Sequence, residues 1–392
     1  MNLPEALLGA SAVLVLVPAT VFFVQVMMAL PAYRPKPLPQ GRRPTVCVLV
    51  PAHNEADGIA SALRFIIPQL ASGDRLLVVA DNCADETARI ASALGADVIE
   101  RRDFERRGKG YALDFGIRHL QNDPPEVIIV IDADCWVHAG AIDRLARTCA
   151  ETNRPVQALY LMIAPAGARL KTRIAEFAWL VKNHLRPLGY HRLGLPCQLM
   201  GTGMALPWSL LSHARLANDN IVEDMKLGID LAAEGFPAIF CPQAMVTSTF
   251  PEGKKAEATQ RTRWEHGHLH MIQHAFPQLL AKAVSKTDIR LLGLALDLAV
   301  PPLSLLLMLL VGVFSGTLAA LGVGVSNGPF ILAAIALGLL MSAVLLAWHG
   351  WGRQLISIVD LLTIPFYVLA KIPLYLKFCI RRQKAWVRTD RN

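Results

Sequence analysis

Hydrophobic positions are distributed very unevenly along this chain. Residues 1–33 carry no charge after Glu5 and are long enough to span a bilayer. Residues 45–285 alternate short apolar runs with helical spacing, and residues 286–380 are again strongly apolar. A proline-rich linker, residues 34–44, and a basic tail, residues 381–392, complete the chain. We therefore expect a globular domain between apolar helices at both ends.

Within the globular region, apolar runs typical of buried strands alternate with segments of helical spacing. The predicted strands are 46–51, 75–80, 96–99 and 127–131, and the predicted helices are 55–70, 84–94 and 110–120. Such alternation forms βαβ units on a parallel sheet. The predicted fold class is therefore α/β, a Rossmann-like, mostly parallel sheet with transmembrane α-helices at both ends of the chain.

The remaining apolar and amphipathic segments suggest several kinds of membrane contact. Residues 301–321 and 330–348 are predicted to span the membrane, and the residues just before them to approach along the interface. Residues 355–380 contain charged and proline residues that make a lipid-facing crossing costly, so we expect an interfacial or re-entrant course. Residues 170–192 fit either an ordinary soluble helix or a helix on the membrane surface.

Composition and charge support a membrane protein. The chain has 392 residues, of which 53% are hydrophobic, and a net charge of +8. Basic clusters follow the first and the last apolar segment, and such flanks are typical of the cytoplasmic side. We expect the globular domain and the tail in the cytoplasm and the N-terminus outside it. The 7 cysteines lack metal-ligand spacing and indicate reduced thiols.

Two carboxylates, Asp132 and Asp134, follow the predicted strand 127–131. Ligands of open α/β sheets collect at the carboxyl ends of strands. Acids spaced in this way suit a hard divalent cation beside a phosphate, so the expected cofactor is Mg²⁺ or Mn²⁺. The alternatives are a solvated acidic loop or Asp134 as the cap of a following helix.

Polar residues also follow the preceding strands. Pro51, His53 and Glu55 come after the first strand, and Asp81 comes after the second. Lys109 lies between two glycines before a predicted helix; without those glycines it would equally suit a solvated loop. Successive strands that end in polar residues at one sheet edge predict a nucleotide-binding cleft.

The order of these motifs resembles that of the family-2 glycosyltransferases of the GT-A fold. Residues 46–134 contain a Pro-x-x-Asn-Glu strand end, an Asp after the second strand, Gly-Lys-Gly and Asp-x-Asp. Downstream, the sequence is similar to the family's small-residue segment at Gly201-Thr202-Gly203, its acidic pair at Glu223-Asp224 and its Gln-x-x-Arg-Trp motif at Gln260 to Trp264. The similarity covers about residues 46–270 and departs at Val222, where many members have Thr or Ser.

The resemblance implies a role for each motif. The residues implied in binding a nucleotide sugar, usually a UDP-sugar, are Pro51, His53, Glu55, Asp81, Lys109, Asp132 and Arg263. Those implied at the acceptor are Gly201, Thr202, Gly203, Gln260 and Trp264. Asp132 and Asp134 would hold the metal, and Asp224 would be the catalytic general base, with Glu223 as a supporting acid. A base opposite the leaving group gives inversion.

Other interpretations of the downstream motifs stay open. Glu223 and Asp224 also suit the polar start of a helix over residues 224–233, where acids favour the helix dipole. Trp264 also suits a buried core position. Histidines also recur at positions 266, 268 and 270. A zinc site there would need further ligands, so an interfacial or acceptor-side role is favoured.

The leading functional hypothesis is an inverting glycosyltransferase at the cytoplasmic face of the inner (plasma) membrane. A bacterial exopolysaccharide synthase, similar to cellulose, hyaluronan or chitin synthases, is favoured over a ceramide- or hopanoid-type glucosyltransferase that adds one sugar to a lipid. A sugar nucleotidyltransferase would need a Gly-rich loop with a basic residue after the first strand, which this sequence lacks. Few spans and an intact set of acids disfavour a transporter or scaffold.

The expected partners follow from this hypothesis. They are a UDP-sugar donor, a polysaccharide or lipid acceptor and membrane lipids. An export partner or a second copy of the chain is compatible with the sequence. Nucleic acid is not expected, because the basic residues flank apolar segments and accompany no nucleic-acid-binding module.

Overall fold

The computed structural model describes residues 3–381 except 213, 215, 218–220 and 252. The basic tail after Arg381 lies outside the described residues. Contacts divide the chain into two compact units, each of which we describe by itself. The helical unit comprises Met1–Tyr33, Ala164–Leu195 and His268–Gln383, and the sheet unit comprises Arg34–Ile163 and Pro196–Gly267. The domain boundaries expected from the sequence remain a prediction.

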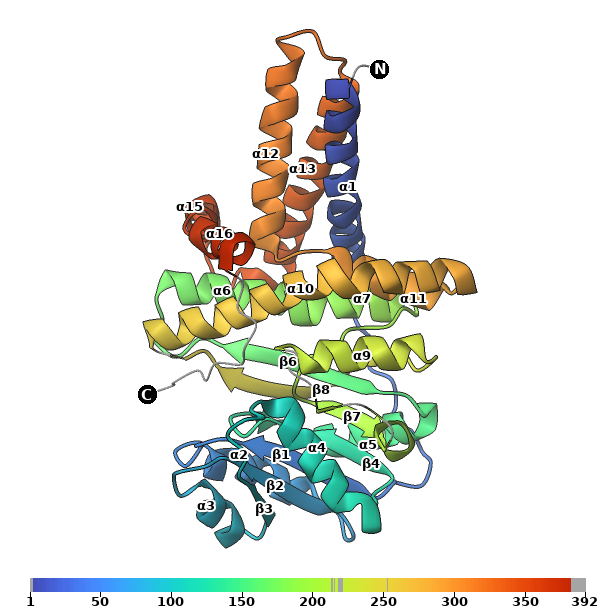
Figure 1. Ribbon diagram of the computed structural model, residues 1–392, viewed down its shortest axis with the longest axis vertical. Coiled ribbons are helices and arrows are strands. Elements are labelled where there is room, and N and C mark those ends of the chain that lie inside the picture. The colour runs from blue at the N-terminus through green and yellow to red at the C-terminus, as the bar shows by residue number, and fades with distance from the viewer. Residues whose placement is uncertain (1–2, 213, 215, 218–220, 252, 382–392) are drawn as a thin grey trace. The chain divides into compact units, whose positions relative to one another are not determined.

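The sheet unit is built on an eight-stranded sheet in the order β3-β2-β1-β4-β7-β6-β8-β5 (Figure 1). Its strands are β1 (Val46–Ala52), β2 (Arg75–Asp81), β3 (Asp97–Arg101), β4 (Val127–Val130), β5 (Trp136–Val137), β6 (Val156–Ile163), β7 (Met204–Pro207) and β8 (Ile239–Thr249). The first four strands in this order are parallel, as predicted. Beyond β4 the sheet is mixed, because β7 runs antiparallel to both β4 and β6. The α/β class is confirmed.

Parallel pairing of β1 with both β2 and β4 brings three strand ends to one edge of the sheet. The side chains of β1 and β4 are almost all buried, which explains their unbroken apolar sequence. Gly116 of α4 (Lys109–His119) allows close packing, since a methyl group there would lie 2.7 Å from Leu49 Cδ1. The polar residues after these strands are therefore held near one another.

Two helices begin later than predicted because the residues before them bind each other. Helix α2 begins at Ile59 and α3 at Thr87, instead of at residues 55 and 84. The amide of Glu55 donates to Thr87 Oγ1 at 2.8 Å, and the side chain of Asn54 accepts from the amide of Ala84 at 2.7 Å. These bonds join the loops after β1 and β2 and position the residues that the sequence analysis singled out there.

The rest of the sheet unit surrounds the later strands. Its further elements are α2 (Ile59–Ile66), α3 (Thr87–Ala93), α5 (Ala141–Thr152), α8 (Trp208–Leu211), α9 (Glu223–Ala233) and the first part of α10 (Lys254–Lys286). Buried Ile142 and Leu145 of α5 belong to the core of this unit. The predicted helix after residue 223 is thus present, and α10 is a single long helix that carries the Gln-x-x-Arg-Trp motif.

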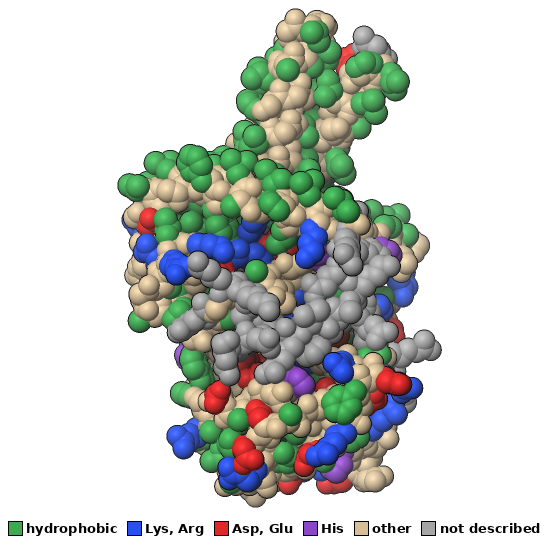
Figure 2. Space-filling model, turned by 60° about the vertical axis from the view of Figure 1, so that its left-hand side comes forward, with side chains coloured by type: hydrophobic (Ala, Val, Ile, Leu, Met, Phe, Trp, Pro, Cys, Tyr) green, Lys and Arg blue, Asp and Glu red, His purple; other side chains and the backbone are tan. Residues whose placement is uncertain are grey.

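Three described helices are long and apolar enough to cross a membrane. They are α1 (Leu3–Ala29), α12 (Leu303–Leu321) and Gly328–Gly352, which includes α13 (Gly328–Ala347). All three lie in the helical unit and pack on one another side by side (Figure 1). Hydrophobic side chains cover much of the bundle face seen in Figure 2. Both ends of the chain therefore contribute to one bundle.

The segment after the bundle breaks into short helices. These are α14 (Ile358–Leu362), α15 (Ile364–Leu369) and α16 (Ile372–Arg381), with 5, 6 and 10 described residues. A span needs about 20 residues, so no single span forms among the described residues here. The interfacial or re-entrant path expected from the sequence remains a prediction.

Other helices of this unit also follow the sequence. Helix α11 (Ile289–Ala299) forms in the segment for which an approach along the interface is predicted, and it ends just before the two prolines. The amphipathic segment forms α6 (Leu170–Leu180), the π-helical turn η3 (Val181–Leu185) and α7 (Arg186–Arg192). Of these, α7 and η3 pack against α1.

Candidate active site

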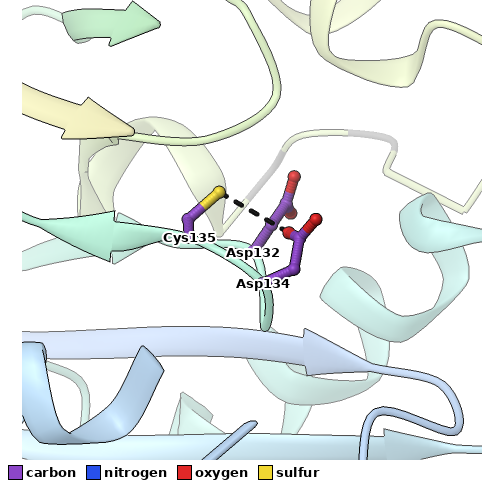
Figure 3. A group of neighbouring side chains, drawn as sticks. All are labelled: Asp132, Asp134 and Cys135. Carbon is purple, nitrogen blue, oxygen red and sulfur yellow. Dashed lines mark hydrogen bonds between the residues drawn. The ribbon is translucent and has the colours of Figure 1, made fainter. Parts of the chain in front are cut away.

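Asp132 and Asp134 lie in the turn that follows β4 (Figure 3). The amide of Cys135 donates to the carbonyl of Asp132 at 3.1 Å, and this turn brings the two carboxylates together. Donor atoms of Asp132, Asp134 and Cys135 lie within 4.8 Å of one another. Burial raises the pKa of the Cys135 thiol well above its ordinary value, so the thiol stays protonated. The two carboxylates alone suit a hard divalent cation.

Lys109 lies in the first turn of α4 and joins this group. Its Nζ forms an ion pair with Asp132 and donates to the carbonyl of Gly201 at 2.7 Å. Burial opposes the charge of Lys109, but the carboxylates of Asp132, Glu223 and Asp224 outweigh it and raise its pKa. The lysine therefore stays charged and supplies a fixed cation beside the aspartate pair.

The segment at residues 201–203 connects Lys109 to the acidic pair of α9. Gly201 and Gly203 have φ angles of 87° and 66°, which favour glycine. A methyl group on Gly201 would lie 3.3 Å from Asp224 Oδ2 and 3.5 Å from Lys109 Nζ. Buried Thr202 accepts from the amide of Asp132 at 3.1 Å. Gly201 is thus the point around which Lys109, Asp132 and Asp224 converge.

Glu223 sits beside Asp224 at the start of α9, next to the same lysine. Burial and the charge of Asp224 raise the pKa of Glu223 to about 7, while Lys109 and Arg263 oppose this rise. Two adjacent carboxyl groups resist simultaneous ionisation when buried. The pair thus supports one charged carboxylate and one group that titrates near neutral pH.

Gln260, Arg263 and Trp264 lie on one turn of α10. Gln260 is buried, and Arg263 and Trp264 are partly buried. Within the described residues, the Nε of Arg263 is buried and has no hydrogen-bond partner. The helix packs closely against Val222, because a methyl group on Gly267 would lie 2.5 Å from Val222 Cγ1. A small apolar residue at position 222 therefore sets the distance between α10 and the acidic pair.

The residues after β1 and β2 form a second, adjoining group. His53 Nδ1 lies 2.5 Å from the carbonyl of Asp81. The carboxylate of Asp81 accepts from Arg101 Nη1 at 2.7 Å and from Asn82 Nδ2 at 2.9 Å, and burial raises its pKa. Pro51 lies within β1, and the backbone carbonyl of Glu55 accepts from the amides at the start of α2. The structure thus holds Pro51, His53, Glu55 and Asp81 at the ends of two adjacent strands.

Sequence reasoning missed several residues that position this site. Arg101, at the end of β3, is buried and pairs with Asp81. Gln157, in β6, is fully buried; it donates to the carbonyl of Thr202 at 2.9 Å and accepts from the amide of Met200 at 2.8 Å. Thr87 joins the loops after β1 and β2. The sequence signal that could have identified Gln157 was an amide side chain within an otherwise apolar strand.

The histidine run of α10 does not form a metal group in the described part of the chain, where the one such group is that of Asp132. His266 and His268 are both buried. Burial lowers the pKa of His268 to about 3, and its Nε2 lies 3.2 Å from the carbonyl of Leu298 within the helical unit. A packing role for His268 follows from these contacts.

Comparison with known families identifies a matching family. The family described as "Glycosyltransferase like family 2" matches residues 44–267, more than half of the chain. The matched range contains every residue of the site described above.

Individual relatives agree with this match. The chain is 27% identical over 239 residues to the probable glycosyltransferase YdaM of Bacillus subtilis, covering 58% of this chain and 56% of that relative. It is 30% identical over 188 residues to the uncharacterized glycosyltransferase Mb0553 of Mycobacterium bovis, covering 42% of this chain and 82% of that relative. The chain thus spans little more than half the length of the first relative.

Among solved structures, the mannosyltransferase PcManGT from Pyrobaculum calidifontis, in complex with GDP-Man and Mn²⁺, has a similar fold. The TM-score is 0.56 and the identity 19%, over 96% of this chain and 100% of that chain. At this identity the similarity concerns the fold, and it extends over the helices as well as the sheet.

Proposed function

The chain belongs to glycosyltransferase family 2, and from this premise we propose that it transfers a sugar, with inversion, from a nucleoside diphosphate sugar to a lipid acceptor at a membrane. The observation that carries this proposal is the convergence of Lys109, Asp132 and Asp224 around Gly201. It puts a cation suited to phosphate beside a carboxylate suited to a hydroxyl proton.

In the proposed reaction, the acceptor hydroxyl oxygen bonds to the anomeric carbon as the bond from that carbon to the diphosphate oxygen breaks. Asp224 takes the proton of the hydroxyl. Lys109 and Arg263 oppose the charge that the diphosphate gains. The Nε of Arg263, which has no hydrogen-bond partner among the described residues, supports this role. Attack from the side opposite the leaving group inverts the anomeric configuration.

Asp132 and Asp134 would hold Mg²⁺ or Mn²⁺. Their spacing and oxygen chemistry fit such an ion, and the Mn²⁺ named with the similar mannosyltransferase structure supports a divalent cation. When bound, the ion would neutralise negative charge on the diphosphate. Asp132 would remain in contact with Lys109, so the two cations would share the anionic donor.

The remaining residues would orient the two substrates. We assign Pro51, His53, Glu55 and Asp81 to the base and ribose of the donor. We assign Gly201, Thr202, Gly203, Gln260 and Trp264 to the acceptor, where the indole offers an apolar face to a sugar ring or lipid. Glu223, with its pKa near 7, would share a proton with the base beside it.

The choice of a lipid acceptor rests on the helical bundle. The sequence favours a polysaccharide product, which would have to leave through a polar conduit. In the described bundle, however, α1 packs directly against α13, and Ala12, Ala19, Phe22, Ala336 and Ala343 of these two helices are fully buried. Close packing of this kind supports a lipid acceptor, which needs no conduit through the bundle.

We place the catalytic residues on the cytoplasmic side of a bacterial inner membrane. The basic cluster after α1 supports this orientation, because such clusters stay in the cytoplasm. With three spans, the N-terminus of α1 lies on the opposite side. The short helices after residue 355 then follow the membrane surface.

The test is product analysis. The purified full chain in lipid vesicles is given Mn²⁺ and, in turn, UDP-glucose, UDP-N-acetylglucosamine and GDP-mannose, and lipids and polymers are analysed by mass spectrometry. We expect a lipid that gains one sugar, and no such product from the Asp224→Asn protein. A ladder of oligosaccharides would show that the acceptor is a polymer instead of a lipid. If every donor stayed intact even with membrane extracts of the source cell present, sugar transfer itself would be contradicted.

A further inference from the structure

Lys371 is the centre of a polar cluster in a largely apolar part of the helical unit. Its Nζ donates to Ser304 Oγ at 3.1 Å and lies 5.2 Å from the centre of the Tyr367 ring. Ser304 Oγ lies 2.6 Å from the hydroxyl of Tyr375. The cluster thus joins the first turn of α12 to α15, to α16 and to the link between them.

Burial differs within this cluster. Ser304 and Tyr375 are each only 8% exposed, whereas Lys371 is partly exposed. The hydroxyl groups of Ser304 and Tyr375 are therefore more buried than the lysine, and the ring of Tyr367 lies beside its ammonium group. These contacts restrict a long side chain that would otherwise sample many rotamers, while Lys371 remains partly exposed.

The surface around Lys371 is strongly apolar. Phe366, Leu369 and Leu376 are 75%, 55% and 56% exposed, and Ile372 directly follows the lysine with 40% exposed. Large apolar side chains this exposed on neighbouring helices indicate contact with lipid. A fixed cation amid such a surface fits a ligand that is both anionic and apolar.

The position of the cluster along the bundle also points to lipid. Ser304 lies at the start of the span α12, and α12 packs against α15 (Figure 1). Ser326, beyond the other end of α12, bonds to Glu5 at the start of α1. The cluster is therefore at the end of the bundle opposite Glu5, and the ends of membrane-spanning helices lie near the lipid headgroups.

We propose that Lys371, supported by Ser304 and Tyr375, binds the phosphate of an anionic membrane phospholipid. The ammonium would contact the phosphate as a compact charge. The acyl chains would lie on the apolar side chains of α15 and α16. This site is separate from the residues proposed for catalysis, and the inference does not depend on the reaction that they perform.

The test is lipid binding by native mass spectrometry. The full chain in detergent is titrated with phosphatidylglycerol or with zwitterionic phosphatidylcholine. Lys371→Gln should weaken phosphatidylglycerol binding about fivefold, the worth of one lysine at a membrane surface, and leave phosphatidylcholine unchanged. The matched control is Lys377→Gln, the same change at an exposed position of α16, which should have little effect. Lys371→Arg should retain binding.

Equal losses in the two glutamine variants would mean diffuse attraction and would overturn the site. So would a site that prefers phosphatidylcholine, or complete displacement of the lipid by millimolar inorganic phosphate. Tyr375→Phe provides a second variant if Lys371→Gln does not fold, because it removes only a hydroxyl. It should weaken phosphatidylglycerol binding alone, and unchanged binding in that variant would contradict the proposal.

Discussion

Charged side chains are buried in both units of this protein, but the two units satisfy them in different ways. In the helical unit, Gln25, Arg186 and Asp297 form what we call the closed network. In the sheet unit, Lys109, Glu223, Asp224 and Arg263 form what we call the open site. The contrast separates buried charge that stabilises a fold from buried charge that we propose is kept for a ligand.

The closed network joins three helices through complementary groups. Arg186 of α7 donates to the side chain of Gln25 at 2.9 Å and to both the carbonyl and the carboxylate of Asp297 at 2.8 Å. Gln25 of α1 donates to the Asp297 carboxylate at 2.6 Å. One cation thus meets one anion, and the amide uses both its donor and its acceptor.

The open site lacks this balance. Two carboxyl groups adjoin each other on α9, and the pKa of Glu223 is raised to about 7 as a result of burial and of Asp224. Within the described residues, the Nε of Arg263 has no hydrogen-bond partner. Buried polar groups usually find partners, so this remaining capacity is what a bound diphosphate and an acceptor hydroxyl would use.

The largest expected effect is on catalysis at the open site. Asp224→Asn should lower turnover by about 10² to 10⁴, the usual worth of a positioned general base. Donor binding should change little, because the residue acts on the acceptor. Steady-state kinetics with donor binding measured separately would check this.

The matched control is Asp230→Asn, the same change at a partly exposed position of α9. It should keep nearly full activity. Loss of donor affinity in Asp224→Asn without loss of turnover by the bound enzyme would remove Asp224 from its proposed role.

The closed network should behave in the opposite way, with a large effect on stability. Arg186→Met leaves the Asp297 carboxylate buried without its cation and should lower the free energy of unfolding by about 3–5 kcal/mol. The double variant Arg186→Met with Asp297→Leu should recover most of this loss. Thermal melts in detergent would measure both, and a double variant less stable than Arg186→Met would show that the network is not a closed charge pair.

The sequence predicted much of the open site and none of the closed network. Runs of apolar residues that end in acids are local signals, and parallel pairing then brings Asp81 and Asp132 to one edge. The closed network has no local signal. Its arginine is 161 positions from Gln25 and 111 from Asp297, so only the packing of helices brings the three residues together.

Non-local pairing also explains the other gaps in the sequence analysis. Strand β6 pairs antiparallel with β7 and parallel with β8, and these strands are far apart along the chain. No turn sequence predicts their pairing. Gln157 supports residues 200–202 only because β6 passes beside them. The predicted starts of α2 and α3 were wrong for a related reason, since loop-to-loop bonds replace the first helical turns.

The pH dependence of the melting temperature should further distinguish the open site from the closed network. The pKa of Glu223 is raised from 4.5 to about 7 in the folded state, so the folded protein retains a proton that the unfolded chain has lost. The resulting destabilisation is absent below pH 4.5, grows as the pH rises and is complete above about 7. Glu223→Gln should flatten this fall in melting temperature.

Exposed Glu234 at the end of α9 provides the control, because Glu234→Gln should leave the pH profile unchanged. If the melting temperatures of Glu223→Gln and of the unmodified protein changed with pH in the same way, the claim that two carboxyl groups are buried side by side at the open site would be wrong.

The smallest expected effect concerns the close packing around the closed network. A methyl group on Gly189 of α7 would lie 1.9 Å from the carbonyl oxygen of Gln25. Gly189→Ala should therefore force α7 away from α1 and lower stability by about 1–3 kcal/mol. Gly338→Ala in α13, where nothing lies within 4 Å, should be neutral or stabilising. Equal melting temperatures of the two variants would argue against this close approach.

The most direct test of the open site is calorimetric titration of the full chain with UDP and with GDP, in Mn²⁺ and in excess chelator. We expect one of these nucleotides to bind in Mn²⁺. Chelator or Asp134→Asn should weaken binding at least about tenfold, through the loss of the cation or of a charged ligand to it. Arg186→Met protein that remains folded should bind like the unmodified chain. Equal affinity in chelator and Mn²⁺, or no binding of either nucleotide, would contradict the claim that this site keeps its charge for a nucleoside diphosphate.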